Sequence, residues 1–458
     1  MTNMSPESDS VNDTICAIAT PPGAGGLGIV RVSGPHVQDI AKCLLGHLPQ
    51  PRYATLANFP DDSGEAIDSG IVLFFSGPAS FTGEDVLELQ GHGGPFVLQQ
   101  LMQRVLDLGA RAARPGEFSE RAFLNDKLDL AQAEAIADLI ESSTDAAARA
   151  AQRSLQGVFS QQVNSLQASL TELRVFVEAA IDFPDEEIDF LAESDVLQRL
   201  DKTSQKLGEL LQEARQGRLL RDGIVLAIIG RPNAGKSSLL NALSGQDSAI
   251  VTEIPGTTRD VLREQIELDG IPVHLADTAG IRETSDRIEA EGVRRARLAL
   301  ESADLALLVE DVTATHAEHD DLALELPPNV GCIRVANKID LGVAAYRQQK
   351  ERGGVMPDLW ISVKTGQGME QLRSRIREAV GAADHAEGSF SARQRHIDAL
   401  NRAQRHLASG RAQLQDSMAG ELLAEELRLT QRALGEITGE FLPDDLLGEI
   451  FASFCIGK

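Results

Sequence analysis

The stretch that decides the fold is IVLAIIGRPNAGKSSLLNAL, residues 224–243. An apolar run the length of a strand leads into a glycine-containing loop, and an apolar, helix-compatible run follows. The loop fits GxxxxGKS in the strand–loop–helix order in which this motif cradles phosphates on backbone N–H groups at a helix N-terminus. Lys236 would bridge the β- and γ-phosphates as a catalytic group, and the Ser237 hydroxyl would ligate Mg²⁺. The loop residues expected to bind the nucleotide are Asn233, Ala234, Gly235, Lys236, Ser237 and Ser238.

Two further segments predict the rest of the phosphate and metal site. Gly256-Thr257-Thr258 lies about twenty residues downstream, where a switch segment would supply the Thr258 hydroxyl as a second Mg²⁺ ligand. Asp277-Thr278-Ala279-Gly280 follows an apolar-leaning stretch. Asp277 would hold the metal through water, and the Gly280 N–H would bind the γ-phosphate.

The base is predicted to be guanine. Asn337-Lys338-Ile339-Asp340 ends an apolar strand at 331–336, and Ser362-Val363-Lys364 follows as the segment expected to pack over the base. The carboxylate of Asp340 accepts hydrogen bonds only, which matches the N1–H and 2-amino donors of guanine. Adenine does not present that pair of donors. Each tetrapeptide alone is a weak signal, but five segments in this order predict a guanine-nucleotide site.

The residue after Gly280 is Ile281, where Ras-like enzymes carry a glutamine that orients the attacking water. An isoleucine side chain cannot polarise water, so another group must do so. Glu289 is the leading candidate, and Arg282, Glu283 and Glu291 compete with it. Alternatively, these acids only complement a helix N-terminus.

The organisation of the 458 residues predicts about three domains. Short apolar runs at 15–20, 28–32, 71–75 and 86–89 predict strands, and helical periodicity begins near Asn125 and continues to about 220. Strand and helix patterns then alternate, as in a parallel sheet, before helix returns after 391. We predict an N-terminal α/β domain at 1–124 and a helical domain at 125–222 and 383–458. A Ras-like P-loop GTPase domain (the G domain) at 223–382 is inserted into the helical domain.

Composition excludes several classes of protein. The net charge of −26 argues against indiscriminate binding of nucleic acid. The basic run that starts at Arg393-Gln394-Arg395-His396 predicts an exposed helix face or a local basic groove. Four widely spaced cysteines fit a reducing cytosol better than a disulfide or zinc framework. Residues 1–13 do not read as a secretory signal, and no apolar run approaches the ~20 residues of a membrane span.

From end to end the chain resembles one family, the bacterial and organellar tRNA-modification GTPases called MnmE or TrmE. The residues that carry the resemblance are FTGED at 81–85, GHGGP at 91–95, RPGEFSERAFLN at 114–125, KLDLAQAEA at 127–135, IDFP at 181–184 and the terminal CIGK at 455–458.

The resemblance implies that the N-terminal domain mediates dimerisation and binds a tetrahydrofolate carrier, in its 5-formyl or 5,10-methylene form. The folate contacts it carries over are Arg31, Glu88, Lys127 and Lys458. A carboxylate such as Glu88 can pair with the donor–acceptor edge of a pterin, and the anionic glutamate tail suits Arg31 or Lys127. Relatives often carry arginine at the position of Ala24, so that side chain's contribution is absent here.

The resemblance also implies hydrolysis stimulated by potassium when two G domains meet across a homodimer. Asn233 matches the family's potassium-ligating asparagine, and Thr252, Ile254 and Thr257 match the loop that supplies the other oxygens. Glu289 matches the family's catalytic glutamate. The nucleotide contacts then extend over Thr252, Glu253, Ile254, Pro255, Gly256, Thr257, Thr258, Asp277, Thr278, Ala279, Gly280, Asn337, Lys338, Asp340, Ser362, Val363 and Lys364.

By resemblance, the chain is a cytoplasmic GTPase that works on tRNA with the flavoprotein MnmG, in a heterotetramer or larger complex, with FAD on the partner only. Together they would install an aminomethyl or carboxymethylaminomethyl group at C5 of the wobble uridine. Cys455 is either a small buried hydrophobe or a catalytic thiol whose pKa Lys458 helps to lower. The rival hypotheses are a regulatory GTPase switch in ribosome assembly or stress response, and a folate-dependent enzyme that acts alone.

Overall fold

The computed structural model describes residues 13–182, 194–231, 233–244, 265–276, 300–301, 303–314, 327, 330–351, 355–381, 389–417, 420–441, 443–454 and 456–457. The chain divides into two compact units. The first comprises residues 1–137 and 432–458, and the second comprises residues 138–431. Among the helices described, none is long and apolar enough to cross a membrane.

The first unit contains a six-stranded sheet in the order β3-β4-β5-β2-β1-β6. Its strands are β1 (Ile15–Ile18), β2 (Gly25–Ser33), β3 (Thr55–Pro60), β4 (Ala66–Phe75), β5 (Val86–Gly93) and β6 (Arg111–Ala112). All neighbouring strands are antiparallel except β1 and β6. The four strands predicted from apolar runs are confirmed with shifted ends, whereas β3 and β6 were missed.

Two helices, α1 (Val37–Leu45) and α2 (Pro95–Asp107), cover one face of this sheet. Alternation along β2 and β5 sends Val30, Val32, Leu87 and Leu89 into the core beneath these helices. The side chains between them, including Arg31 and Glu88, therefore belong to the opposite face. This face carries the N-terminal candidate site.

Helix α3 (Glu117–Leu124) and helix α14 (Asp444–Ala452) pack together in the same unit. Phe451 and Phe454 are buried with Leu130 and Ala133 from the start of α4 (Leu130–Glu141). Gly116 makes this approach possible, because a Cβ there would lie 2.3 Å from the Phe451 carbonyl oxygen. Helix α14 and Phe454 are thus held against α3 and α4.

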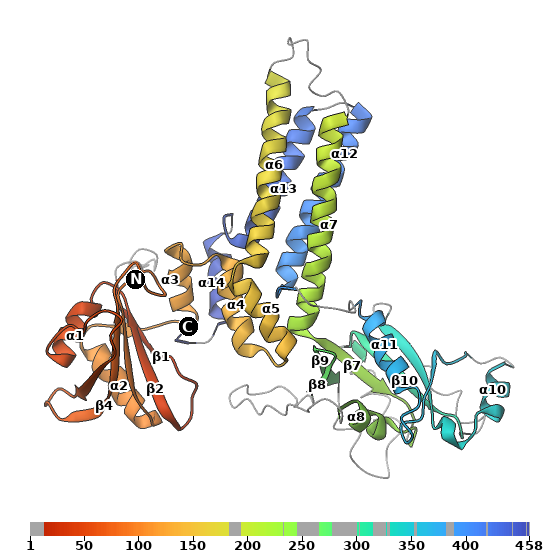
Figure 1. The fold of residues 1–458 in the computed structure, drawn as a ribbon, viewed down its shortest axis with the longest axis horizontal. Helices are drawn as coiled ribbons and strands as arrows, with labels where there is room; N and C mark the ends of the chain where they lie inside the picture. Colours follow the sequence, from red (N-terminus) through yellow and green to blue (C-terminus); the bar gives the residue numbers. More distant parts are fainter. Residues whose placement is uncertain are drawn as a thin grey trace, which may run out of the picture. The chain divides into compact units, whose positions relative to one another are not determined.

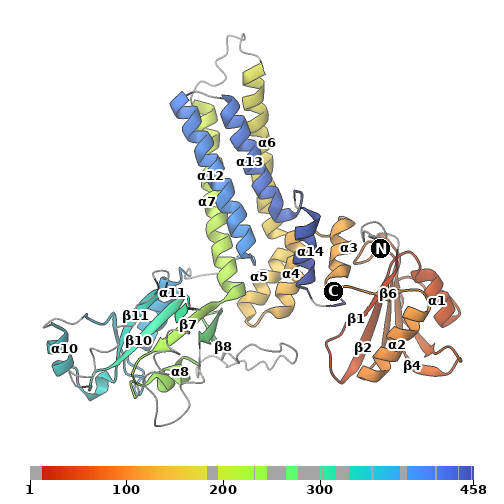
Figure 2. The same ribbon diagram turned by 180° about the vertical axis from the view of Figure 1, so that it is seen from behind.

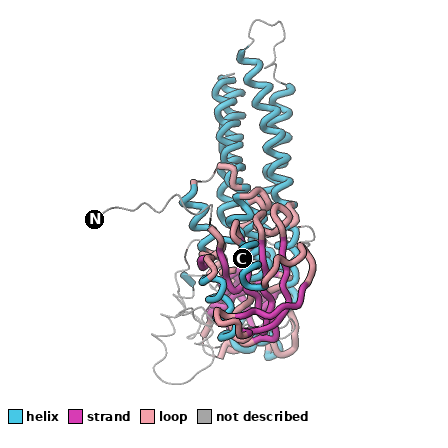
Figure 3. Tube along the Cα trace, turned by 90° about the vertical axis from the view of Figure 1, so that its left-hand side faces the viewer, coloured by secondary structure: helices cyan, strands magenta, loops and turns pink. Residues whose placement is uncertain are grey.

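The second unit is built on long helices, α6 (Val158–Asp182), α7 (Ser194–Asp222), α12 (Gln394–Ser417) and the larger part of α13 (Gly420–Thr438), whose residues 432–438 belong to the first unit. Their axes run side by side as a bundle (Figures 1 and 2). The view turned by 90° in Figure 3 shows the same arrangement. The short helix α5 (Asp145–Leu155) precedes α6, and Gly157 separates the two with a φ of 84°. The helical periodicity predicted on both sides of the inserted domain is confirmed.

A buried ion-pair cluster lies where the chain leaves and rejoins the bundle. The Asp138 carboxylate accepts from Arg221 Nε and from Arg393 Nη2, both at 2.7 Å, and from the Ser391 hydroxyl at 3.0 Å. His396 is only 2% exposed and lies against the Phe159 ring. The prediction of an exposed basic face is therefore wrong for Arg393 and His396. Arg393 is paired with the buried Asp138, and His396 is packed against the Phe159 ring.

The inserted domain is a six-stranded sheet in the order β12-β11-β10-β7-β9-β8. The strands are β7 (Ile224–Ile229), β8 (Gln265–Leu268), β9 (Ile271–Ala276), β10 (Leu305–Asp311), β11 (Gly331–Asn337) and β12 (Leu359–Trp360), and the helices are α8 (Lys236–Ser244), α10 (Ala344–Glu351) and α11 (Met369–Ala379). Every neighbouring pair is parallel except β8 and β9. This confirms the predicted fold class, an α/β domain inserted into a helical domain behind an N-terminal α/β domain.

Candidate functional site

The P-loop connects the end of β7 to the start of α8, as its sequence predicts. Gly230 is required there, because a Cβ would lie 2.3 Å from the Val309 carbonyl oxygen. Lys236 Nζ donates to the carbonyl oxygens of Gly230 at 2.7 Å and Arg231 at 2.8 Å. Burial lowers the pKa of Lys236. An anion bound within the loop would favour the charged form of this lysine, which burial disfavours.

Asn337 joins the P-loop to both base-recognition segments. Its Nδ2 donates to the Ala234 carbonyl at 3.0 Å, and its Oδ1 accepts from the Val363 N–H at 3.3 Å. Gly235 has a φ of 94° and leaves no room for a side chain, since a Cβ would lie 2.3 Å from Asn337 Nδ2. Three segments far apart in the sequence therefore form one hydrogen-bonded unit.

Lys338 makes a second connection to the P-loop. Its Nζ donates to the Asn233 carbonyl oxygen at 2.7 Å and pairs with Asp311 Oδ2 at 2.6 Å. Burial by itself raises the pKa of Asp311, but the hydrogen bonds from Lys338 and Thr313 outweigh it and lower that pKa overall. Sequence reasoning missed Asp311. The available signal was an acid at the carboxyl end of a strand beside β7, because ligands of parallel sheets bind at that edge.

Asp340, the residue predicted to read guanine, is exposed, and the buried Ser362 fixes its orientation. The Ser362 hydroxyl donates to Asp340 Oδ1 at 2.7 Å and accepts from the Thr365 N–H at 3.2 Å. An ionised carboxylate has about four acceptor positions, so this bond leaves capacity for two donors of a base.

The remaining residues predicted to bind nucleotide or metal fall into two groups, those that the structure describes and those that it does not. Asn233 and Ser237 are exposed, on the P-loop and on the first turn of α8, and a serine hydroxyl supplies an oxygen, the type of donor atom that Mg²⁺ requires. Lys364 is also exposed. The other predicted residues lie outside the described part of the chain, and their roles stay predictions: Thr252, Glu253, Ile254, Pro255, Gly256, Thr257, Thr258, Asp277, Thr278, Ala279, Gly280 and Glu289.

In the N-terminal domain, Arg31 and Glu88 are direct partners on adjacent strands. Arg31 Nη2 lies 2.9 Å from Glu88 Oε1, and Nη1 donates to the Gly457 carbonyl at 3.2 Å. The Arg31 guanidinium carbon lies 5.9 and 5.8 Å from the ring centroids of Phe81 and Phe118. The sequence did not identify the two rings or the Gly457 carbonyl as parts of this site.

Lys127, the third predicted folate contact, is exposed, and its Nζ donates to the Pro78 carbonyl at 3.0 Å. Lys458 and Cys455 lie outside the residues that the structure describes.

The sequence blocks at 81–85 and 114–125 meet in an ion-pair network beside this site. Arg121 is 6% exposed and pairs with Glu84 at 3.1 Å, Glu117 at 3.3 Å and Asp13 at 2.7 Å. A buried arginine is tolerated when its charge and donors are matched in this way. The network ties the loop before β5 to α3, which carries Phe118.

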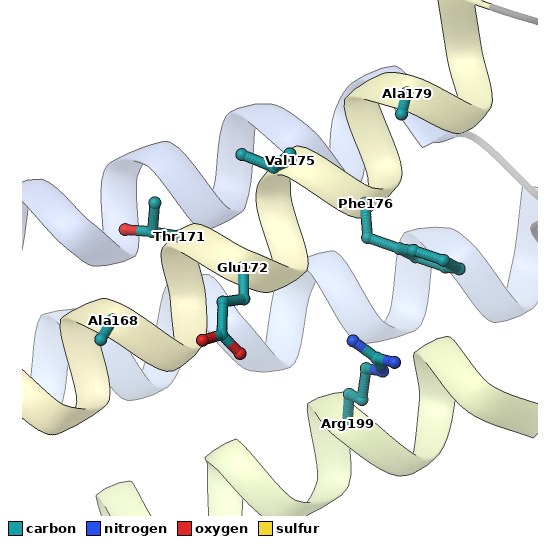
Figure 4. Close-up of a pocket in the computed structure, with 7 residues that line it drawn as sticks. All are labelled: Ala168, Thr171, Glu172, Val175, Phe176, Ala179 and Arg199. Atoms are coloured by element: carbon teal, nitrogen blue, oxygen red, sulfur yellow. The ribbon is translucent and has the colours of Figure 1, made fainter.

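A groove with a volume of about 750 Å³ lies between α6 and α7 (Figure 4). Phe176 and Arg199 contribute to its wall, with the Arg199 guanidinium carbon 5.1 Å from the ring centroid. None of the predicted site residues lines it. The candidate nucleotide site lies instead on loops at the carboxyl edge of the G-domain sheet, and the N-terminal candidate site lies on the open face of β2 and β5.

Comparison with known proteins gives matches along nearly the whole chain. A family model described as the MnmE helical domain matches residues 130–455, and one described as the GTP-binding protein TrmE N-terminus matches residues 14–127. The tRNA modification GTPase MnmE of Stutzerimonas stutzeri is 58% identical over 97% of this chain and 99% of its own length. The protein of that name from Pseudomonas syringae pv. tomato is 57% identical, again over 97% and 99%.

Among solved structures, the G domain of the FeoB iron transporter of T. maritima is 29% identical to this chain. The match covers 34% of this chain and 98% of that one with a TM-score of 0.25, which is too low to carry an argument.

Proposed function

From the premise that the chain belongs to the MnmE family of tRNA-modification GTPases, and is thus a GTP-hydrolysing enzyme of tRNA modification, we propose its reaction. Acting with MnmG, it installs an aminomethyl or carboxymethylaminomethyl group at C5 of the wobble uridine. The observation that carries the proposal is 58% identity over 97% of the chain. The folate supplies the carbon, the flavin stays on the partner, and GTP hydrolysis drives domain movement.

In this proposal the described half of the nucleotide site binds and orients GTP. Lys236 and the N-terminus of α8 hold the phosphates, and Asp340 reads the guanine edge. Ser237, with Thr258, would hold Mg²⁺, which when bound would supply positive charge beside the phosphates. Support comes from Asn337 and Lys338, whose hydrogen bonds to the Ala234 and Asn233 carbonyls make phosphate and base recognition one unit.

We propose that Asn233, Thr252, Ile254 and Thr257 hold a potassium ion, and that Glu289 orients the attacking water. When bound, the ion supplies positive charge where other GTPases use an arginine finger. The fit of Asn233 is supported by its position. Its carbonyl is held by Lys338, and the residue is exposed in the left-handed region with a φ of 64°.

The folate proposal assigns the two ends of the ligand to different residues. Since Arg31 and Glu88 are paired at 2.9 Å, they meet the same part of a ligand rather than its opposite ends. Arg31 orients the Glu88 carboxylate toward the pterin edge. Of the two cations that suit the anionic glutamate tail, this geometry favours the exposed Lys127. Lys458 completes the proposed contacts.

Calorimetry with 5-formyltetrahydrofolate is expected to show a site in the intact protein. Arg31→Ala should weaken binding roughly tenfold to a hundredfold, because the buried face of Glu88 loses a charge-assisted partner. The matched control is Arg52→Ala. Arg52 also lies near a ring, that of Phe75, and donates to a backbone carbonyl, that of Ala79, but it is not a predicted folate contact. Unchanged binding in Arg31→Ala would remove Arg31 from the site.

The proposal also includes a cytoplasmic homodimer and the domain division 1–124, 125–222, 223–382 and 383–458. Leu56 and Ile71 support dimerisation through the N-terminal domain. They are register partners on β3 and β4, yet they are 81% and 43% exposed. Support for the boundary at 222/223 comes from α7, which ends at Asp222, and β7, which begins at Ile224.

The whole proposal is tested by mass spectrometry of wobble uridines in cells that lack the chain. The modified uridine should disappear and return when the wild-type chain is restored. The Lys236→Ala chain should not restore it, because GTP binding and turnover are both impaired. Normal wobble uridines in the deleted cells would support the regulatory-switch alternative.

A further inference from the structure

Gly457, near the end of the chain, lies in a close-fitting seat on the N-terminal domain. Gly457 has a φ of 92°, and a Cβ on it would lie 2.6 Å from the Ile18 carbonyl oxygen and 2.9 Å from Ala19 Cα. Both neighbours are backbone atoms at the end of β1, so they cannot rotate away as a side chain could. The seat therefore admits glycine alone, and the Gly457 carbonyl is the group that accepts from Arg31.

The tail is also fixed just before this seat. Phe451 and Phe454 are buried against α4. The Phe451 carbonyl lies so close to Gly116 that a Cβ at that position would clash with it. Ile456 lies between these anchors and Gly457, and it is 58% exposed. Among the described residues of the tail, one point of attachment is the buried pair Phe451 and Phe454, and the other is Gly457. Gly457 contacts a charged side chain, that of Arg31.

Arg31 is held in place before it meets the tail. Glu88 Oε1 accepts a hydrogen bond from Arg31 Nε at 3.0 Å and lies 2.9 Å from Arg31 Nη2. Glu88 thus binds one edge of the guanidinium group. Phe81 and Phe118 lie near the guanidinium carbon. These contacts leave Nη1 to donate to Gly457. A planar, preorganised fork loses little entropy on making this bond, and a lysine ammonium cannot make both contacts in the same geometry.

We propose that Arg31 and Gly457 form a latch that seats the end of the chain on the sheet beside Glu88. Arg31 is then a positioning residue for the modification step, because the latch fixes Gly457, which directly precedes Lys458 and lies two residues after Cys455. The seating follows from the contacts alone, whereas its consequence for modification rests on the proposed function.

The latch is tested by the release of Lys458 by carboxypeptidase B from the 458-residue chain. The bond this protease cuts has the Gly457 carbonyl as its reacting group, so the latch must open before cleavage. Arg31→Lys and Gly457→Ala should each release Lys458 roughly tenfold or more faster than wild type, as expected for the loss of one hydrogen bond to a charged group. Each rate is divided by the rate for a synthetic peptide that has the same C-terminal sequence. This removes any difference in how fast the protease cleaves the wild-type and Gly457→Ala sequences themselves.

Two variants serve as controls. Arg52→Lys changes another arginine of the domain that contacts a ring and a backbone carbonyl, and Ile456→Ala changes the exposed residue of the tail. Both should keep the wild-type rate. Wild-type release as fast as that of the free peptide, or Arg31→Lys release at the wild-type rate, would overturn the latch.

Wobble-uridine analysis of the same variants separates the latch from the proposed function. Modification should fall in Gly457→Ala while GTP turnover is unchanged, since the tail and the G domain belong to different units of the chain. If the variants release Lys458 fast but modify wobble uridines normally, the contact between Arg31 and Gly457 would stand and its positioning role would be overturned. Absence of modification even with the wild-type chain would instead contradict the proposed function, without bearing on the protease result.

Discussion

Steady-state GTP turnover is expected to be far faster in potassium chloride than in matched sodium chloride. Ile281 cannot orient water, and no arginine finger is evident in the sequence, so basal hydrolysis should be slow. An arginine finger raises hydrolysis by about 10³–10⁵, and a potassium ion in the same place should recover at least about tenfold. Sodium is smaller than the predicted cage and should stimulate only weakly. Asn233→Ala should remove the difference between the two salts.

Glu289→Ala should abolish turnover in both salts and leave GTP binding intact, because a water-orienting group acts mainly in the transition state. Asn241→Ala is the matched control for Asn233→Ala, since Asn241 is an exposed asparagine in α8. Equal rates in the two salts would rule out the cation mechanism. An active Glu289→Ala enzyme would return the role to Arg282, Glu283 or Glu291.

Asp340→Asn is expected to weaken GTP binding by roughly 10²–10⁴, and to shift preference toward xanthosine triphosphate. The range corresponds to losing two hydrogen bonds to a charged acceptor at about 1.5–3 kcal/mol each. Xanthine presents a carbonyl oxygen where guanine has its 2-amino group, and an amide side chain can donate to that oxygen. Competition binding with the two triphosphates measures the shift.

Ser362→Ala is the informative comparison for this variant. It removes the hydroxyl that donates to Asp340 Oδ1 at 2.7 Å but keeps the carboxylate. Affinity should fall by about tenfold or less, without a change of base preference, because orientation is lost but the acceptors remain. Normal GTP binding by Asp340→Asn would show that the base is read elsewhere.

The sequence predicted the parts of the fold that local pattern determines. Ile224–Ile229 and the residues of α8 carry unmistakable strand and helix signals, and the motifs after them were in the right order. The short strands β6 and β12 have two residues each, which is too few for any periodicity to register. They form because neighbouring strands offer them hydrogen bonds.

The missed site contacts share one physical cause. Asp311 meets Lys338, and Gly457 meets Arg31 across 426 positions, only because tertiary packing brings them together. His396 looked like a surface charge because its sequence neighbours are arginines, whereas it is buried against Phe159 and its Nδ1 accepts from the Arg393 N–H. A single sequence carries no direct signal for such pairings.

The Asp138 cluster also has a consequence for how the protein is made. Arg221 and Arg393 both bind Asp138, yet about 170 residues separate them in synthesis. At about 5–20 residues per second, the ribosome needs roughly 10–30 s to pass from one to the other. Until α12 has been made, α7 lacks the helix that packs against it in the finished bundle. We expect the surface of α7 that α12 later covers to stay exposed on the nascent chain during that interval, in which the G domain is synthesised.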